Sequence, residues 1–550
     1  MGSNTKLALA LVATSALVMP SLAAAAPLQE FTQVDGNGVD LVSGQFFFSL
    51  VEGSIGDDES GVSLVRSWSG INGWQDNWSG VAYQTTENGQ TVYYVEFGPI
   101  SDSFTFSGGN FISRKGDGAI LTVGGTSLAY TASDGTGYNY NGAFDDGRPF
   151  AGPRCPSGGC YIPISITKPN GRTFTLNWDF DAYFQNPLVY YRLAGVDSSA
   201  NYNFSITYLT ANPGQGSAPV PNWLKRTKVE FTNTLSPPSP LPTVTYAYPS
   251  SAIIDITVPG ARTWRLTAAA GGNLNGIRRP GSAVDNVTIG YSVGAPTVSS
   301  VIKDGVTTSY SRVVNGTTIT ETRTDALSNQ VVVTADTAVN RPSSVKDPLN
   351  RTTSYQYDSN KRLTRLSQPE GNYVQATYDG RGNVTQLRQV AKAGSGLADI
   401  VESAGYDATC SNQLTCNQPS NTTDAKGNVT DYTYDSTHGG VLTVTDPAPT
   451  TGAIRPQTRG SYTLTAGAYL LTGISECQTL SSCTNAVDEA KTALGYNSNA
   501  LPTTVTRSNG AGTLAATSTM TYDSIGNLLT VDGPLTGGRG CHALPLRRCA

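Results

Sequence analysis

The chain is 550 residues long, carries 59 Gly and 30 Pro, and has a net charge of −5 from 36 basic and 41 acidic residues. A chain of this length exceeds one ordinary domain. Neither sign of charge is clustered, and this argues against a nucleic-acid-binding protein, which needs a stripe of Lys and Arg. Helical patterns are scarce, with one short candidate at 486–491, so the composition favours an all-β extracellular protein.

The first 25 residues have the pattern of an export signal. Lys6 supplies positive charge, 7–18 is apolar, and the alanines at 23–25 offer a cleavage site. The apolar run is too short to span a membrane, which takes roughly 18 residues, and no later run is long enough. We predict a signal peptide at 1–25 and a mature protein that is secreted, periplasmic or at the cell surface, with no transmembrane span.

Residues 26–270 form a β-rich N-terminal region with two sets of candidate functional residues. Acidic runs at 57–59 and 145–146 could supply the paired carboxylates of glycoside hydrolysis, but acidic loop runs are usually solvated. A loop at 35–40 resembles a calcium loop only weakly, because Asp40 stands where a Gly is needed. We therefore expect no catalytic group and no metal or cofactor here.

Aromatic residues are frequent at the start of this region. Trp68, Trp74, Trp78, Tyr93 and Tyr94 could form a platform on which a sugar stacks. Large amphipathic rings more often cover the core of a sheet. We expect these residues to be core residues.

Six cysteines lie in close pairs along the chain. Local disulfides at hairpin tips are typical of exported proteins, and each would close a small loop. The alternative is a metal site, which needs four ligands at tighter spacing. We predict three disulfides: Cys155–Cys160, Cys410–Cys416 and Cys477–Cys483.

Residues 271–539 repeat one short pattern. Tyr357-Asp358 is followed by 362–364 (Arg-Leu-Thr), and 21 residues further on Tyr378-Asp379 is followed by Gly382-Asn383. Gly and Asn supply the positive φ of tight turns, while Tyr, Thr and Val fit a half-buried pleated surface. Such periodicity predicts hairpins that must stack to bury their faces. Further copies occur at Tyr406-Asp407, Tyr434-Asp435 and Tyr522-Asp523, the last followed by Gly526-Asn527.

This pattern resembles the RHS or YD-repeat family of cell-surface proteins, clearly over about 320–535. The opening at 39–44 and 61–68 is also similar to the start of such proteins. The resemblance implies an all-β fold in which YD hairpins form a spiral sheet, part of a hollow shell that often encloses a C-terminal toxin. In each YD step we expect the Tyr to be a packing residue and the Asp to accept backbone N–H bonds at the following turn.

Residues 540–550 break the repeat pattern. A one-base shift in one permitted set of codons would restore a further Tyr-Asp step, so we interpret 540–550 as a frameshifted tail of a truncated chain. The alternative is a short natural tail.

Groups that could catalyse a reaction are scarce. The chain has two His: His438, in a turn where we expect it to be solvated, and His542, in the tail. Neither a Ser-His-Asp nor a Cys-His arrangement can be built from so few. The sequence favours a non-enzymatic, exported scaffold that in full-length form would encapsulate or present a C-terminal toxin or surface domain. The alternative is a carbohydrate-binding protein whose partners are cell-surface glycans.

Overall fold

The computed structural model describes residues 33–70, 73–98, 100–143, 150–151, 160–181, 189–210, 221–269, 271–477, 479–534 and 541–543. These residues contain no α-helix, only a short 3₁₀ turn at Pro221–Leu224. The candidate helix at 486–491 is wrong, because Glu489 begins a strand. The rest of the regular structure is strand, and the all-β prediction is confirmed.

Two small antiparallel sheets come first. The inner sheet consists of β1 (Phe47–Ile55), β2 (Val62–Ser69) and β3 (Gly73–Asp76). The second sheet consists of β4 (Gly80–Glu87), β5 (Gln90–Phe97), β6 (Ile100–Ser107) and β7 (Asn110–Ser113).

One large antiparallel sheet follows, in which almost every strand pairs with the next along the chain. Its first half contains β8 (Ile120–Val123), β9 (Ser127–Thr131), β10 (Gly137–Asn141), β11 (Phe150–Ala151), β12 (Ile162–Thr167), β13 (Thr173–Asp181), β14 (Val189–Ser198), β15 (Tyr202–Tyr208), β16 (Arg226–Asn233), β17 (Thr243–Ser250), β18 (Ile253–Val258), β19 (Arg262–Ala268), β20 (Leu274–Arg278), β21 (Val287–Tyr291), β22 (Val298–Lys303), β23 (Val306–Asn315), β24 (Thr318–Thr324), β25 (Gln330–Asp336) and β26 (Arg341–Lys346). The proposed boundary at 270 falls between β19 and β20, which pair with each other.

The strands β27 to β40 of the same sheet are called the repeat arm below. They are β27 (Thr352–Tyr357), β28 (Leu363–Ser367), β29 (Tyr373–Tyr378), β30 (Val384–Val390), β31 (Ile400–Gly405), β32 (Asn421–Thr423), β33 (Val429–Tyr434), β34 (Val441–Thr445), β35 (Gln457–Thr465), β36 (Ala468–Cys477), β37 (Glu489–Tyr496), β38 (Pro502–Asn509), β39 (Ala515–Tyr522) and β40 (Leu528–Asp532). A last short strand, β41 (Cys541–Ala543), pairs with β40.

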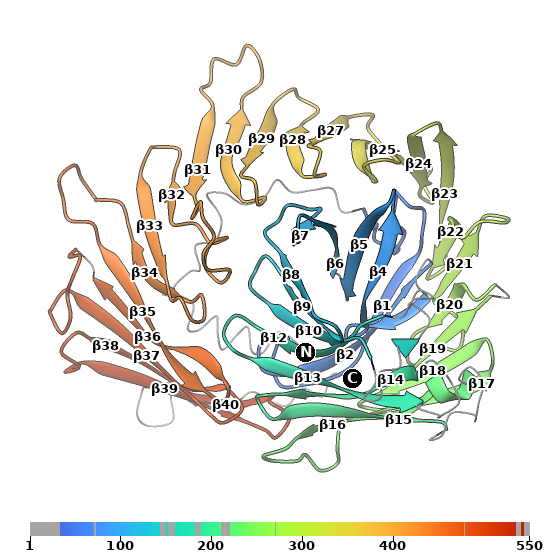
Figure 1. Cartoon of the computed structure of the whole chain (residues 1–550), viewed down its shortest axis with the longest axis horizontal. Helices are drawn as coiled ribbons and strands as arrows, with labels where there is room; N and C mark the ends of the chain where they lie inside the picture. Colours follow the sequence, from blue (N-terminus) through green and yellow to red (C-terminus); the bar gives the residue numbers. More distant parts are fainter. Residues whose placement is uncertain are drawn as a thin grey trace.

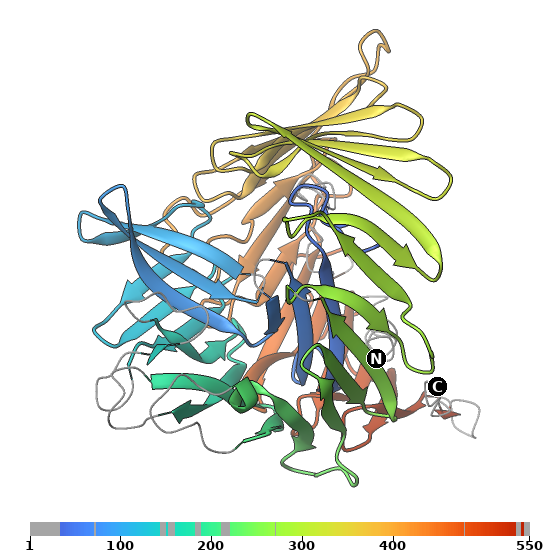
Figure 2. The ribbon, with the colours of Figure 1, turned by 90° about the vertical axis from the view of Figure 1, so that its right-hand side faces the viewer.

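The large sheet curves around the two small ones. Figure 1 shows it starting in the interior at β8, β9 and β10, beside β4 to β7, and then curving outward through β15, β20 and β30 to β40. The side view in Figure 2 agrees, with the inner sheet lying between the green and the orange strands. The chain therefore forms an outer wall and an inner set of strands.

The apolar core lies between these two layers and is unevenly distributed. One continuous cluster runs from Val39 to Ala335 and joins the two small sheets to β8 through β25. Within the described residues, the repeat arm contributes only small clusters, such as Tyr355 with Leu363 and Ala376. Burial of apolar surface is the main driving force of folding, so the first half is a packed two-layer body and the arm is a wall one sheet thick.

Candidate functional site

The corner that follows the YD steps at Asp358, Asp379 and Asp523 is a five-residue turn built around its aspartate, whereas Asp407 and Asp435 accept backbone N–H groups in turns of other shapes. At Asp379, Oδ1 accepts the backbone N–H groups of Arg381 and Asn383, both at 2.9 Å, and Oδ2 accepts Asn383 Nδ2 at 2.9 Å. Gly382 has a φ of +88°, in the left-handed region. The expected hydrogen-bonding role of the Asp and the positive φ of the Gly are confirmed, and one carboxylate satisfies donors that a tight turn leaves unpaired.

The same turn recurs along the large sheet with different side chains. At Asp358 the partner four residues on is Arg362, whose Nε donates at 2.7 Å, and the left-handed position is occupied by Lys361 at +62°. The Gly-Asn and Lys-Arg variants therefore build one geometry. Other copies are centred on Asp325, Asp347, Asp424, Asn497 and Asp523, the last with Gly526 and Asn527.

The YD tyrosine connects successive hairpins. Tyr378 ends β29 directly after a register shift, and its hydroxyl donates to the carbonyl of Leu363, at the start of the preceding strand, at 2.6 Å. Burial raises the pKa of such hydroxyls, as at Tyr496, where the pKa is raised to about 12. Equivalent bonds to earlier backbone carbonyls are made by Tyr357, Tyr406, Tyr434 and Tyr522.

The YD corners also meet the N-terminal region. Four contacts between turns, called the seam below, join the two: Gly118 and Ser133 with 413–417, Arg172 with Ala466, Ala200 with Asn499, and Gly56 with Ile525. Each arm turn in the seam follows an odd-numbered strand (β31, β35, β37 or β39), and because consecutive strands are antiparallel these turns all lie at the same end of the arm. The repeat pattern predicted turns but gave no sign that one end of the arm docks on residues about 300 positions earlier or more.

Arg172 shows how closely the seam is packed. Its side chain is 1% exposed, and Nη1 donates to the carbonyl of Ala466 at 2.5 Å and to Ser199 Oγ at 3.2 Å. The backbone N–H of Tyr469 in the same hairpin donates to the carbonyl of Asn170 at 2.7 Å. An arginine is rarely this buried without such partners, so this contact fixes β35 and β36 against β13.

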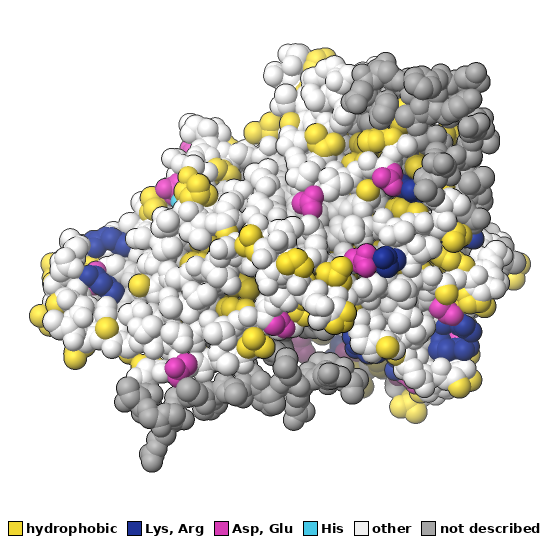
Figure 3. All heavy atoms as spheres, turned by 90° about the horizontal axis from the view of Figure 1, so that it is seen from below, with side chains coloured by type: hydrophobic (Ala, Val, Ile, Leu, Met, Phe, Trp, Pro, Cys, Tyr) yellow, Lys and Arg dark blue, Asp and Glu magenta, His cyan; other side chains and the backbone are white. Residues whose placement is uncertain are grey.

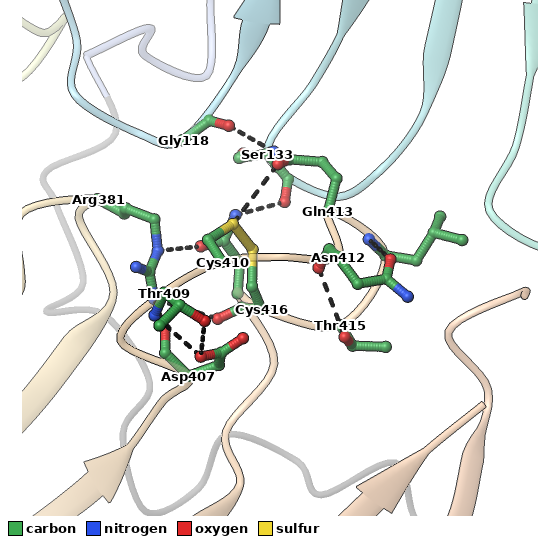
Figure 4. Close-up of a disulfide and its surroundings, with 12 residues drawn as sticks. Gly118, Ser133, Arg381, Asp407, Thr409, Cys410, Asn412, Gln413, Thr415 and Cys416 are labelled. Atoms are coloured by element: carbon green, nitrogen blue, oxygen red, sulfur yellow. Dashed lines mark hydrogen bonds between the residues drawn. A yellow bond between two sulfur atoms is a disulfide. The ribbon is translucent and has the colours of Figure 1, made fainter. Parts of the chain in front are cut away.

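A disulfide-closed loop forms one part of the seam. Cys410 and Cys416 are bonded, and Figure 4 shows their loop between Arg381 and the turns that carry Gly118 and Ser133. Cys477 and Cys483 are bonded as well, so two of the three predicted disulfides are confirmed. Cys155 lies outside the described residues, and the pair Cys155–Cys160 stays a prediction.

The candidate catalytic acids have structural partners or lie in solvent. Asp57 accepts the backbone N–H of Ser60 at 2.7 Å, and Asp58 and Glu59 are exposed. The pair at 145–146 lies outside the described residues. Asp35 and Asp40, in the weak calcium-like loop, each accept two backbone N–H groups. Where the structure describes the chain, no three His, Cys, Asp or Glu side chains gather as a metal site would require.

His438 is buried, so the expectation of a solvated turn residue is wrong. It is 6% exposed, and its ring stacks on that of Tyr469 with the centroids 4.6 Å apart. Its Nδ1 accepts the backbone N–H of Gly440 at 3.1 Å. The physical reason is the fold: the hairpin of Tyr469 covers this corner, which the local sequence could not reveal.

The aromatic residues of the N-terminal region are core residues, as expected. Trp68, Trp78 and Tyr93 are each less than a tenth exposed, and Trp74 packs edge-to-face on Trp68 at 5.1 Å. Tyr94 is partly buried and stacks on its cross-strand neighbour, Tyr83. These rings are occupied by packing and do not form an open platform.

Sequence reasoning missed a buried ion-pair network between the inner sheet and the wall. Glu52 on β1 is 1% exposed and accepts bonds from Arg66 Nε and from the hydroxyl of Tyr246, on β17. Asp76 on β3 accepts a bond from Arg226 Nη2, on β16. Burial and then the charge of Glu52 raise the pKa of Tyr246. The one signal in the sequence is Glu52 itself, a charged residue within an otherwise mostly apolar strand.

On the face seen from below in Figure 3, acidic and basic side chains lie scattered among uncharged atoms. Across the described part of the chain, no helix is long and apolar enough to cross a membrane. The features that stand out are therefore structural: the YD corners, the hydrogen bonds from YD tyrosine hydroxyls to earlier backbone carbonyls, and the seam.

A comparison with protein-family models matches residues 336–373 to the family described as RHS Repeat. The chain contains an RHS repeat. This match includes the turn at Asp347 and the YD step Tyr357-Asp358, and it confirms the resemblance seen in the sequence. No curated protein matches the chain in sequence.

Solved structures similar to the RHS-repeat chain are large toxin complexes. A crystal structure of TcdB2-TccC3-Cdc42 matches at 12% identity and a TM-score of 0.29, and covers 87% of this chain. TcdB2-TccC3 without its hypervariable C-terminal region matches at 10% and 0.30, and the Tc holotoxin pore of Photorhabdus luminescens at 12% and 0.29. The chain spans 27% of the length of the first two and 26% of the third.

Proposed function

We propose that this chain is an exported, non-enzymatic scaffold whose sheet forms the wall of a shell, and that the full-length protein encloses or presents a C-terminal toxin or surface domain. One observation carries the proposal: a single continuous sheet curves around the N-terminal strands and is tied back to them along the seam. A sheet held in this way has a fixed curvature, and the same face of the sheet always points toward the enclosed space.

The uneven distribution of the apolar core between the two halves supports the assignment of the repeat arm as a shell wall. The first half holds the large apolar core, whereas the described strands of the repeat arm bury only small clusters. A sheet one layer thick contributes little core of its own and depends on its neighbours for stability. The RHS Repeat match lies where the arm begins, and the resemblance implies enclosure of a C-terminal domain.

Export is part of the proposal. The signal predicted at 1–25 would deliver the chain to an oxidising compartment, and two local disulfides fit that destination. Candidate partners are a C-terminal toxin domain encoded downstream and, in the alternative function, cell-surface glycans.

Enclosure can be tested with a reporter. A small folded domain would be fused after residue 550 through a linker that a sequence-specific protease cuts. We expect the linker to be cut at least about tenfold more slowly than the same linker on the free reporter, because only local opening would expose it. The control is Arg172→Ala with Asn499→Ala, which loosens the seam and should restore cutting. Equal rates on the intact chain and the free reporter would contradict enclosure.

The same preparation tests the other two assignments. Incubation with a panel of polysaccharides and ester substrates should give no turnover, and turnover would contradict the non-enzymatic assignment. Retention on a glycan array would favour the carbohydrate-binding alternative.

A further inference from the structure

The loop 410–417 connects three parts of the molecule. On one side Gln413 Nε2 donates to the carbonyl of Gly118, and Asn417 Nδ2 donates to that of Ser133 at 2.9 Å. On the opposite side lies Arg381, from a YD corner (Figure 4), whose Nε donates to Asn417 Oδ1 at 3.1 Å.

The approach of the loop to the N-terminal turns is close. A Cβ placed on Gly135 would lie 2.8 Å from Leu414 Cδ2, and one on Gly118 would lie 3.0 Å from Asn417 Nδ2. Both glycines have a φ above +80°. The fit therefore depends on the loop keeping one conformation.

The disulfide maintains that conformation. Cys410 has a φ of +51°, a left-handed value that a non-glycine residue adopts only when its surroundings impose it. Within the loop, backbone bonds hold only its second half, from Asn412 to Thr415 and Cys416. Besides the disulfide, the carboxylate of Asp407 accepts the backbone N–H of Cys410, so breaking the sulfur link removes the covalent constraint on this conformation and leaves an exposed hydrogen bond.

The second described disulfide differs in its position. Cys477–Cys483 has the same separation of six residues, yet its loop bonds to its own hairpins, with Thr479 and Leu480 donating to Asp488. No bond from this loop to the N-terminal region occurs among the described residues. It is therefore a matched control for the effect of closing a loop.

We propose that Cys410–Cys416 is a redox latch on the seam: its reduction releases the loop from the turns at 116–118 and 133–135 and opens this side of the wall. Cys416 is 0% exposed and Cys410 is partly exposed, so a thiol reaches the bond from the Cys410 side. A dithiol supplies the two electrons. One thiolate attacks a sulfur and displaces the other as a thiolate, and the second thiol then closes the cyclic disulfide of the reductant and leaves two cysteine thiols.

The test is hydrogen–deuterium exchange of the full chain with and without dithiothreitol. On reduction, peptides covering 116–136 should exchange about tenfold faster, because their docking partner is released. Cys410→Ser with Cys416→Ser should show the faster exchange without reductant. Cys477→Ser with Cys483→Ser should keep the slow exchange and its response to reductant.

A second variant separates the latch from a folding defect. Asn417→Ala with Gln413→Ala leaves both disulfides intact and removes the docking bonds, so it should raise exchange at 116–136 without reductant. The proposal is overturned if reduction leaves exchange at 116–136 unchanged, or if the Cys477 and Cys483 variant abolishes the response.

Discussion

One carboxylate organises each five-residue corner of the repeat, as at Asp379. The aspartate accepts two backbone N–H groups and one side-chain donor, and the residue three positions on takes a left-handed conformation. Because Lys361 and Asn350 adopt this conformation as well as Gly382, the corner constrains the backbone more strongly than it constrains the residue type. This is why the repeat varies at that position and keeps an Asp at the first, or at Asn497 an Asn whose Oδ1 accepts the same two backbone N–H groups.

Replacing Gly382 by Val should lower the free energy of unfolding by roughly 1–2 kcal/mol, because a β-branched residue is strained at positive φ. Chemical denaturation measures this directly. Gly380→Val is the matched control, since Gly380 lies in the same turn without a positive φ and has no atom within 4 Å of an added Cβ. Equal losses in both variants would show that the left-handed conformation is not the cause.

The buried carboxyl of Glu321 should make the free energy of unfolding depend on pH. Its side chain is 0% exposed; burial, partly opposed by Arg312 at 3.3 Å, raises its pKa to about 7. In the unfolded state the Glu321 carboxyl has its ordinary pKa of 4.5, so between about pH 4.5 and 7 the folded state keeps a proton that the unfolded state has lost. The free energy of unfolding therefore falls as the pH rises through this range. The loss is at most about 3 kcal/mol.

Glu321→Gln should remove that loss. We expect the variant to gain stability over the native chain between pH 5 and pH 8, measured by denaturation at each pH. Glu370→Gln, at an exposed position, is the control and should show no such gain. If the difference in the free energy of unfolding between the native chain and Glu321→Gln were the same at pH 5 and pH 8, the raised pKa of Glu321 would be contradicted.

At the scale of the strand pair, a tyrosine hydroxyl links each hairpin to the one before it. The tie spans 15 residues at Tyr378 and Leu363 and 20 residues at Tyr522 and Pro502. Insertions between hairpins therefore change the length of the loop and leave the tyrosine–carbonyl hydrogen bond in place. A hairpin alone is marginally stable, so such links between neighbours matter.

Tyr378→Phe should cost about 1 kcal/mol, the usual net value of one hydrogen bond with its acceptor left unpaired. The melting temperature and the denaturant midpoint should both fall. Tyr373→Phe is the control, because that ring lies under Arg365 and its hydroxyl makes no bond to a described residue. An unchanged midpoint in Tyr378→Phe would show that the tie is not stabilising.

The remaining cysteine pair is tested by peptide mapping. Digestion of the protein without reductant should yield Cys155 linked to Cys160, together with the two described bonds. Bonds between the pairs, or a free thiol at Cys160, would contradict the prediction of local closure.

At the scale of the whole molecule, the wall and the inner sheet are joined by buried charges as well as by apolar contacts. Asp76 and Arg226 are both largely buried and pair across the layers. Removing one member of such a pair leaves a buried charge without a partner.

Asp76→Ala should therefore destabilise the chain by about 3–5 kcal/mol, measured by chemical denaturation. Asp255→Ala breaks a more exposed pair with Arg265 and should cost about 1 kcal/mol or less. Similar losses in both would mean that the layers do not depend on the buried pair.

The sequence by itself determined the fold class, the hairpin corners and two of the disulfides, since each depends on residues close together in the chain. The Asp of a corner and its partner are four positions apart, and bonded cysteines are six apart. Only the tertiary structure decided the seam, the burial of His438 and the network at Glu52. These features join residues far apart in the chain, by 299 positions in the bond from Asn499 to Ala200 and by still more in the bond from Gly56 to Ile525. No local pattern encodes such a contact, because it exists only once the sheet has curved round and brought its end back to its beginning.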